Sequence, residues 1–280
     1  MLIFISQLTQ LPQDLFRQIS MLRARGFSES KTEIPLKVLV IVHAYWPQQF
    51  RTIIEHLNRI KMPLSVVVTI PQGVHTIQIE ELLSTLCKHH NVNSMRVENA
   101  GRDVGPFLMA IEALGNRDWN LVIKVHTKAS QNIWFETLVK SLLQSDRRIQ
   151  SYAKLLARYP NSIIVHPLFR YPGHRQSVDE PAMQRLRDVL ISKNYPSPRK
   201  WYFAAGSMFA ALPTMLVEVK HESETVGLAQ FESEIEYSQA SSAHVFERFI
   251  GLYASSKGTG LLSTSISDYL DFKALLVKII

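Results

Sequence analysis

The sequence has a single cysteine, Cys87, and no apolar run as long as a membrane span. One cysteine excludes an internal disulfide and any zinc site built on paired cysteines, and it fits a reducing compartment. Apolar runs such as residues 38–42 have only the length of a buried strand, whereas a transmembrane helix requires roughly 18 apolar residues. The first residues carry neither a basic region nor a small-residue cleavage pattern. We therefore expect no signal peptide, no transmembrane segment and a cytoplasmic location.

Acidic residues are outnumbered by basic ones, 24 against 31, which gives a net charge of +7. Such a charge favours a polyanionic partner: nucleic acid, an anionic membrane surface or a phosphorylated substrate. The basic residues are dispersed along the chain, and no nucleic-acid-binding motif accompanies them. We expect no nucleic-acid partner, and instead a basic surface that associates peripherally with the inner face of the plasma membrane.

Short β-branched apolar runs alternate with amphipathic helical patterns along most of the chain. Strands are predicted at residues 37–43, 64–70, 95–97, 120–125, 162–165 and 201–211, and helices at 47–60, 77–89, 104–114, 133–143, 147–159, from 213 and at 242–254. This alternation indicates βαβ units, and hence an α/β fold with an open, mostly parallel sheet and helices on both faces. We expect a single domain over 37–260, an amphipathic helical segment at 1–36 and a C-terminal tail at 261–280 packing on the domain. Residues 167–181, rich in Pro, Gly, His and charge, indicate an active-site loop.

Polar residues follow several of these predicted strands at the point where each strand ends. They are His43, Thr69, the segment from Asn99 to Asp103, and the segment from His126 to Lys128. Ligands of open parallel sheets bind beyond the carboxyl ends of the strands, so these elements are expected to converge on one edge and form a binding site.

The segment from Asn99 to Asp103 precedes a predicted helix and is a candidate anion site. Gly101 can adopt a positive φ or let a ligand approach the backbone, and Arg102 offers a planar fork of donors for a diphosphate. Asp103 can cap the helix or accept a hydrogen bond from a sugar hydroxyl. The alternative interpretation is structural, with Asp103 as a plain N-cap and Arg102 in solvent.

Two basic side chains, His126 and Lys128, stand two residues apart after a strand and can point the same way. The charge that develops on a leaving diphosphate is neutralised either by a metal ion or by fixed cations. The chain contains no Asp-x-Asp pair, and His166 and His174 match no standard ligand spacing. We therefore expect basic side chains to neutralise the diphosphate, and we expect no metal ion and no cofactor. A hydrogen-bonded histidine at a strand end is the alternative for His126.

At these residues the sequence resembles the rhamnan synthesis protein F family. Five motifs in the family's order carry the resemblance: residues 42–47, 99–107, 124–128, 205–209 and 243–251. The resemblance spans about residues 37–255 and implies a glycosyltransferase A-type fold, with a Rossmann-like nucleotide-binding half and an acceptor half. It implies a nucleotide sugar donor, deoxythymidine- or guanosine-diphosphate rhamnose, and a glycan or lipid-linked glycan acceptor of a bacterial surface polysaccharide such as O-antigen. In two places the chain departs from the family, with Gln239-Ala240 in place of Asp-Gly and with Ala210 in place of an aromatic residue.

An inverting sugar transfer requires a base at the acceptor hydroxyl, which is expected in the second half of the chain. The candidates are Glu247 and His244, three residues apart on one helix, with Asp103 as a further catalytic candidate and residues 232–236 as a reserve of carboxylates. Glu247 can instead pair with Arg248.

Small residues and aromatic rings complete the expected site. Gly206, Ser207 and Met208 are assigned to the acceptor side, where a glycine lets a ligand pass close to the backbone, although tight sheet packing explains it equally. Tyr45 after the first strand can stack on a base or a sugar, or serve as a hydrophobic anchor.

Three hypotheses about function can thus be tested. The first is a metal-independent glycosyltransferase in which His126, Lys128 and Arg102 neutralise the diphosphate. The second, motivated by Gln239, is a catalytically impaired glycosyltransferase-like subunit that binds nucleotide or glycan within a synthesis complex. Nucleic-acid binding through the basic surface is a third, which predicts strongly salt-dependent retention on DNA or RNA.

Overall fold

The computed structural model describes residues 36–264 apart from 74–75, 87, 115–118, 130–132, 174–179, 229, 232–240 and 259. The predicted N-terminal helical segment, Cys87, His174, Gln239, the reserve carboxylates at 232–236 and most of the C-terminal tail lie outside the described residues. Among the residues described, no helix has both the length and the apolar character that a membrane crossing needs.

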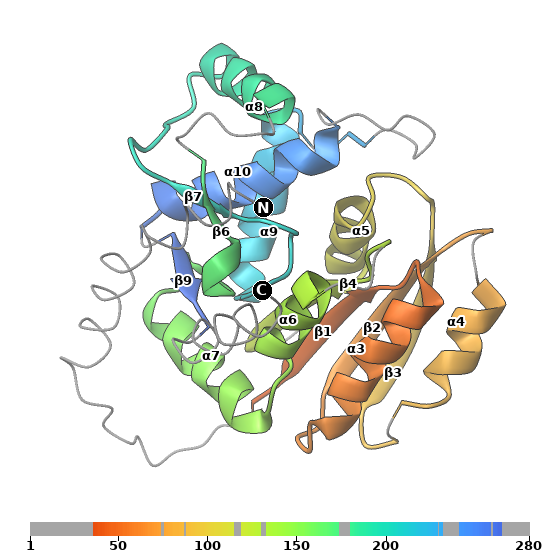
Figure 1. Cartoon of the computed structure of the whole chain (residues 1–280). Helices are drawn as coiled ribbons and strands as arrows, with labels where there is room; N and C mark the ends of the chain where they lie inside the picture. Colours follow the sequence, from red (N-terminus) through yellow and green to blue (C-terminus); the bar gives the residue numbers. More distant parts are fainter. Residues whose placement is uncertain are drawn as a thin grey trace, which may run out of the picture.

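The described chain alternates strands and helices, as the sequence pattern predicts (Figure 1). The order is β1 (Val38–His43), α3 (Pro47–Arg59), β2 (Ser65–Pro71), α4 (Thr76–Leu83), β3 (Asn91–Val97), α5 (Val104–Leu114), β4 (Leu121–His126), α6 (Ile133–Leu142), α7 (Asp146–Arg158), β5 (Ile163–Val165), a 3₁₀ turn (Pro167–Phe169), β6 (Arg170–Pro172), α8 (Glu180–Ser192), β7 (Tyr202–Ala204), β8 (Phe209–Ala211), α9 (Pro213–Thr225), α10 (Ser242–Ser256) and β9 (Leu261–Ser263).

Among the described residues, seven strands form the main sheet in the order β3-β2-β1-β4-β8-β5-β9. The first four pair in parallel, and β8 runs antiparallel to both its neighbours, β4 and β5. Strands β6 and β7 form a separate antiparallel pair. The expected α/β fold with an open, mostly parallel sheet is therefore confirmed.

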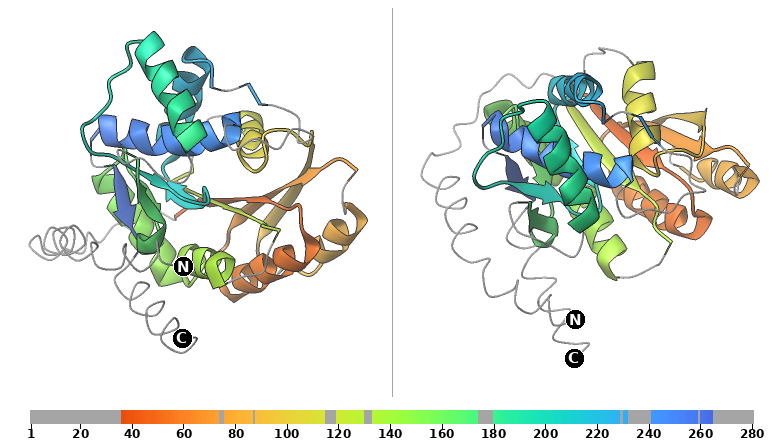
Figure 2. Two further views of the ribbon diagram at one scale, coloured as in Figure 1. Left: turned by 45° about the horizontal axis from the view of Figure 1, so that its top comes forward. Right: turned by 90° about the horizontal axis from the view of Figure 1, so that it is seen from above.

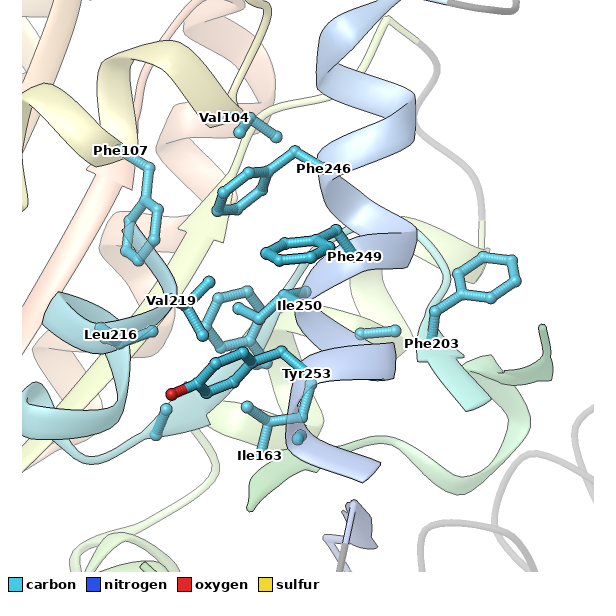
Figure 3. Close-up of a cluster of buried hydrophobic side chains, with 14 of the residues drawn as sticks. Val104, Phe107, Ile163, Phe203, Leu216, Val219, Phe246, Phe249, Ile250 and Tyr253 are labelled. Atoms are coloured by element: carbon cyan, nitrogen blue, oxygen red, sulfur yellow. The ribbon is translucent and has the colours of Figure 1, made fainter. Parts of the chain in front are cut away.

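Helices cover both faces of this sheet (Figure 2). Each face has its own hydrophobic cluster. Along β1, Leu39 and Ile41 join the cluster shared with α5, α8, α9 and α10, while the alternate residues join the cluster under α3, α4, α6 and α7. All six residues of β1 are buried, which explains its continuous apolar run. Figure 3 shows the first cluster, where Phe246 and Phe249 of α10 face Phe107 of α5.

Three sequence predictions of local structure need correction. The predicted strand 201–211 is two short strands, β7 and β8, because Gly206 and Ser207 between them have positive φ angles of 84° and 46° and break the ladder. The predicted loop 167–181 contains β6 and the start of helix α8 at Glu180, a helix that was not predicted. The helix predicted at 77–89 is shorter in the structure: α4 ends at Leu83, and turn residues connect it to β3.

Candidate active site

A cavity of about 410 Å³ lies at the carboxyl ends of β1 and β4. The loop before α5, the turn between β7 and β8, and the first turns of α10 close its other sides. Of the residues predicted from sequence, the following line it: His43, Tyr45, Gly101, Arg102, Asp103, His126, Lys128, Gly206, Ser207, His244 and Glu247.

Three predicted residues do not line the cavity. Thr69 is fully buried, and its hydroxyl lies 3.0 Å from Nδ1 of His43, so it supports that ring. Met208 is 1% exposed and packs in the cluster under α3 and α6. Asn99 lies half-buried two residues before Gly101. A side chain near a strand end can point either to the cavity or into the hydrophobic core, and sequence position alone did not show which of the two it does.

Strand register explains why the polar strand ends meet. His43 of β1 is paired with His126 of β4 on one side and with Thr69 of β2 on the other. Burial lowers the pKa of His43 to about 3, so its ring is neutral near pH 7. Next to it, the hydroxyl of Thr127 accepts hydrogen bonds from the backbone N–H groups of Tyr45 (2.8 Å) and Trp46 (3.1 Å). That hydroxyl holds the aromatic pair at the cavity.

The loop before α5 adopts the left-handed conformation at two consecutive residues, Gly101 (φ 69°) and Arg102 (φ 54°). The positive φ expected of Gly101 is confirmed, and a Cβ there would come within 2.5 Å of the Phe231 ring. The glycine is thus required by protein packing as well as by the backbone. Arg102 reaches across to the second half of the chain, and one of its guanidinium N–H groups donates to Nε2 of His244 at 2.9 Å. Arg102 and His244 therefore meet across the cavity.

Lys124, in the middle of β4, is a residue of this site that sequence reasoning did not assign. Its ammonium group donates to the carboxylate of Asp103, to the carbonyl oxygen of Ser207 (2.8 Å) and to the hydroxyl of Ser207 (3.1 Å). The hydroxyl of Ser207 in turn donates to Asp103. A lysine inside a fully buried strand was the available signal, because an unpaired charge cannot be buried cheaply.

Asp103 is therefore an ion-pair partner. Among the described residues it accepts from Lys124 and Ser207, and its carboxylate also lies 3.6 Å from Nε2 of His126. Burial acts to raise its pKa, but the charge that His126 carries once protonated at acidic pH, the charge of Lys124, and the hydrogen bonds from Lys124 and Ser207 outweigh burial and hold that pKa well below its ordinary value. Such a carboxylate stays ionised near pH 7, and its described hydrogen-bond donors are protein groups, Lys124 and Ser207. The catalytic role of Asp103 stays a prediction.

The turn between β7 and β8 holds Glu247 in the cavity. The backbone N–H of Gly206 donates to Oε1 of Glu247 at 2.8 Å, and a guanidinium nitrogen of Arg248 lies 3.7 Å from Oε2. Burial raises the pKa of Glu247 above its ordinary value, with Arg248 opposing the shift. The result is a largely buried carboxyl group with raised proton affinity that lines the cavity.

His126 is a neutral ring near pH 7, whereas the sequence interpretation treated it as a cation. Its two ring nitrogens lie 2.8 Å from the carbonyl oxygen of Gly206 and 2.9 Å from that of Thr127. A proton on each nitrogen would suit this geometry, but burial lowers the pKa of His126 to about 4. Positive charge at the cavity near pH 7 therefore comes from Arg102 and Lys128. Within the described part of the chain, no group of three or more His, Cys, Asp or Glu side chains is placed to hold a metal ion.

The sequence profile of the rhamnan synthesis protein F family matches residues 11–164, which is 154 of the 280 residues. This chain belongs to that family. The matched part includes the family segments that carry His43, Gly101 to Asp103 and His126 to Lys128, and it ends before β6. The residues of the cavity that belong to the β7–β8 turn and to α10 lie beyond it.

Two curated relatives of this family member are uncharacterized WxcX proteins from two strains of Xanthomonas campestris pv. campestris. Each is 26% identical over 234 residues, a match that covers 78% of this chain and 31% of the relative. The chain therefore spans about a third of the length of the curated relatives it matches.

Solved structures similar to this family member include residues 1–349 of S. aureus TarS, with 15% identity and a TM-score of 0.39 over 81% of this chain and 58% of that one. The galactosyltransferase LgtC, in complex with donor and acceptor sugar analogues, has 8% identity and a TM-score of 0.38 over 81% and 72%. The bifunctional glycosyltransferase WbbM has 11% identity and a TM-score of 0.40 over 80% and 39%. At these scores the fold assignment rests on the sheet topology itself.

Proposed function

We propose that this chain is a glycosyltransferase of polysaccharide synthesis that moves a sugar, with rhamnose the first candidate, from a nucleoside diphosphate donor to a glycan hydroxyl. The observation that supports the proposal is that basic side chains and a carboxyl group line the same cavity. Arg102 and Lys128 supply positive charge from the loops at the ends of the parallel strands, and Glu247 supplies a carboxyl group of raised pKa from α10. Membership of the rhamnan synthesis protein F family supports the sugar and the process.

The two cations suit a leaving diphosphate. When the anomeric carbon–oxygen bond breaks, the diphosphate oxygen keeps the electron pair, and nearby positive charges lower the energy of that state. Lys128 lines the cavity, and its Nζ lies beside the β7–β8 turn, 3.1 Å from the position of a Cβ built on Gly206. Arg102 can present two N–H groups to phosphate oxygens. With these cations as the neutralising groups, the reaction we propose is metal-independent.

Glu247 is the proposed base. In an inverting transfer the acceptor oxygen bonds to the anomeric carbon as its proton passes to the base. Burial raises the proton affinity of Glu247, and the N–H of Gly206 fixes one carboxylate oxygen at 2.8 Å. His244 is less suited to this role, because its Nε2 accepts a hydrogen bond from Arg102. Tyr45 and Trp46 are proposed to stack on the nucleotide base or a sugar.

A turnover assay with nucleotide sugars tests the proposal. Deoxythymidine-, guanosine- and uridine-diphosphate sugars, rhamnose first, are incubated with the chain, and release of the nucleoside diphosphate is measured. Glu247→Gln keeps an oxygen that can accept from Gly206 but cannot take a proton, so turnover is expected to fall by about 10²–10⁴-fold with little change in donor binding. Glu218→Gln is the matched control, since Glu218 accepts from the Tyr253 hydroxyl (2.9 Å) outside the cavity.

Two outcomes count against this proposal in different ways. Donor binding without turnover of any nucleotide sugar would favour the second function, a glycosyltransferase-like binding subunit, which the Gln239 departure motivates. Unaltered turnover in Glu247→Gln would show that another group accepts the proton.

A further inference from the structure

The buried ammonium of Lys124 has no direct route to a substrate. All six residues of β4 are buried, and Lys124 does not line the cavity. Its ammonium nitrogen lies 5.4 Å and 5.9 Å from the ring centroids of Phe107 and Phe209. Phe107 belongs to the cluster drawn in Figure 3. Three acceptors, one on Asp103 and two on Ser207, use its three protons.

Burying this charge pair is an expensive way to stabilise a fold. Each buried ion loses several kcal/mol of hydration, and apolar side chains of the same volume often give equal or greater stability. Burial lowers the pKa of Lys124, although Asp103 offsets part of this effect. The contacts of the pair therefore need an explanation beyond packing.

Those contacts hold a strained turn. Ser207 has φ 46°, a conformation that costs a residue other than glycine on the order of 1–3 kcal/mol. Lys124 binds both the carbonyl oxygen and the hydroxyl of Ser207, and Asp103 binds the hydroxyl from the other side. The residue before it, Gly206, directs its N–H to Glu247 and its carbonyl oxygen to His126. The orientation of Glu247 thus depends on a turn that the ion pair fixes.

We propose that Lys124, paired with Asp103, is a positioning residue that sets the β7–β8 turn and through it aims the Glu247 carboxylate. The inference rests on the proposed function in taking Glu247 as the proton acceptor. It gives Asp103 a role in organising the site in place of contact with the sugar. It also links the first half of the chain, where Lys124 and Asp103 lie, to α10 in the second half.

The test removes both charges so that neither is left buried alone. In the double variant Lys124→Met with Asp103→Asn, the side-chain volumes are nearly kept. The expected result is a folded protein whose kcat falls about 10- to 100-fold, with an unchanged KM for the donor and a shifted acidic limb of the kcat–pH profile. The control is Lys220→Met, which removes a lysine paired with Glu224 at the surface. A folded double variant with the kcat and pH profile of the wild type would overturn the proposal.

A second readout needs no turnover. The Gly206 amide should report the titration of Glu247 in NMR spectra, and its hydrogen exchange should be slow. Both are expected to be lost in the double variant, and both persisting would overturn the proposal even if the wild type transfers no sugar. If the double variant fails to fold, Lys124→Leu with Asp103→Asn takes its place, because it removes the same two charges and puts in β4 an apolar side chain that is common in buried strands. Unchanged exchange and titration of Gly206 in that variant would equally contradict the proposal.

Discussion

Replacing Gly206 with alanine should impair the site more than it impairs the fold. Gly206 has φ 84°, and alanine in the left-handed region costs roughly 1–2 kcal/mol. Steric cost adds little, since a Cβ would first meet two side-chain ends, Nζ of Lys128 at 3.1 Å and Cδ1 of Leu138 at 3.2 Å. A shift of roughly 2–4 °C in Tm is expected for each kcal/mol. If the turn relaxes, however, Glu247 loses its N–H donor and His126 loses its acceptor.

Gly227→Ala provides the matched control. Gly227 has φ 79° just after α9, with no atom within 4 Å of a built Cβ, so the backbone cost is the same and no cavity residue is touched. We expect both variants to lose similar stability in urea unfolding, and only Gly206→Ala to lose turnover, by on the order of 10-fold or more. Equal turnover in the two variants would refute the claim that the β7–β8 turn organises the site.

Three further predictions follow from the buried groups. Below about pH 6.5 the free energy of unfolding should fall, because the pKa of His43 and of His126 is 6.5 in the unfolded chain but about 3 and about 4 in the folded protein. For His126 this loss of stability approaches about 3 kcal/mol. A free energy of unfolding that stays constant between about pH 7 and pH 4 in urea experiments would contradict this prediction. An anion in the cavity favours the charged ring of His126 and should raise its pKa. Calorimetry in buffers of different ionisation enthalpy should therefore show proton uptake when a nucleoside diphosphate binds. Binding enthalpies that do not depend on the buffer would exclude this proton uptake. Gly101→Ala should be strongly destabilising, since its Cβ would lie 2.5 Å from the Phe231 ring, and adding Phe231→Ala should recover only the steric part and not the cost of φ 69°.

Strand ends were predictable because their pattern is local. Continuous β-branched runs mark β1, β2 and β4, and parallel pairing then places His43 and His126 side by side, as the register shows. The positive φ of Gly101 and the bounds of α5, Val104–Leu114, could be predicted for the same reason, since glycine and proline act on their own segment. Helix α8 also had a local signal that was missed: Pro181 at its start, followed by apolar residues at helical spacing.

The remaining features depend on contacts between distant residues. Residues 201–211 are largely apolar on both sides of Gly206 and Ser207, and the break at these two residues is stabilised by Glu247, His126 and Lys124. Lys124 pairs with Asp103, 21 residues away, and with Ser207, 83 residues away. Neither the role of Lys124 nor the neutral state of His126 can be derived without knowing which groups surround them.

Calorimetric binding of nucleoside diphosphates with and without magnesium, in wild type and Lys128→Ala, tests the central claim most directly. Lys154→Ala on α7 serves as the control for removing an exposed lysine. We expect a nucleoside diphosphate to bind without magnesium and Lys128→Ala to weaken this binding about 10-fold or more, which corresponds to roughly 1.4 kcal/mol. Binding that requires magnesium and is unchanged by Lys128→Ala would contradict it.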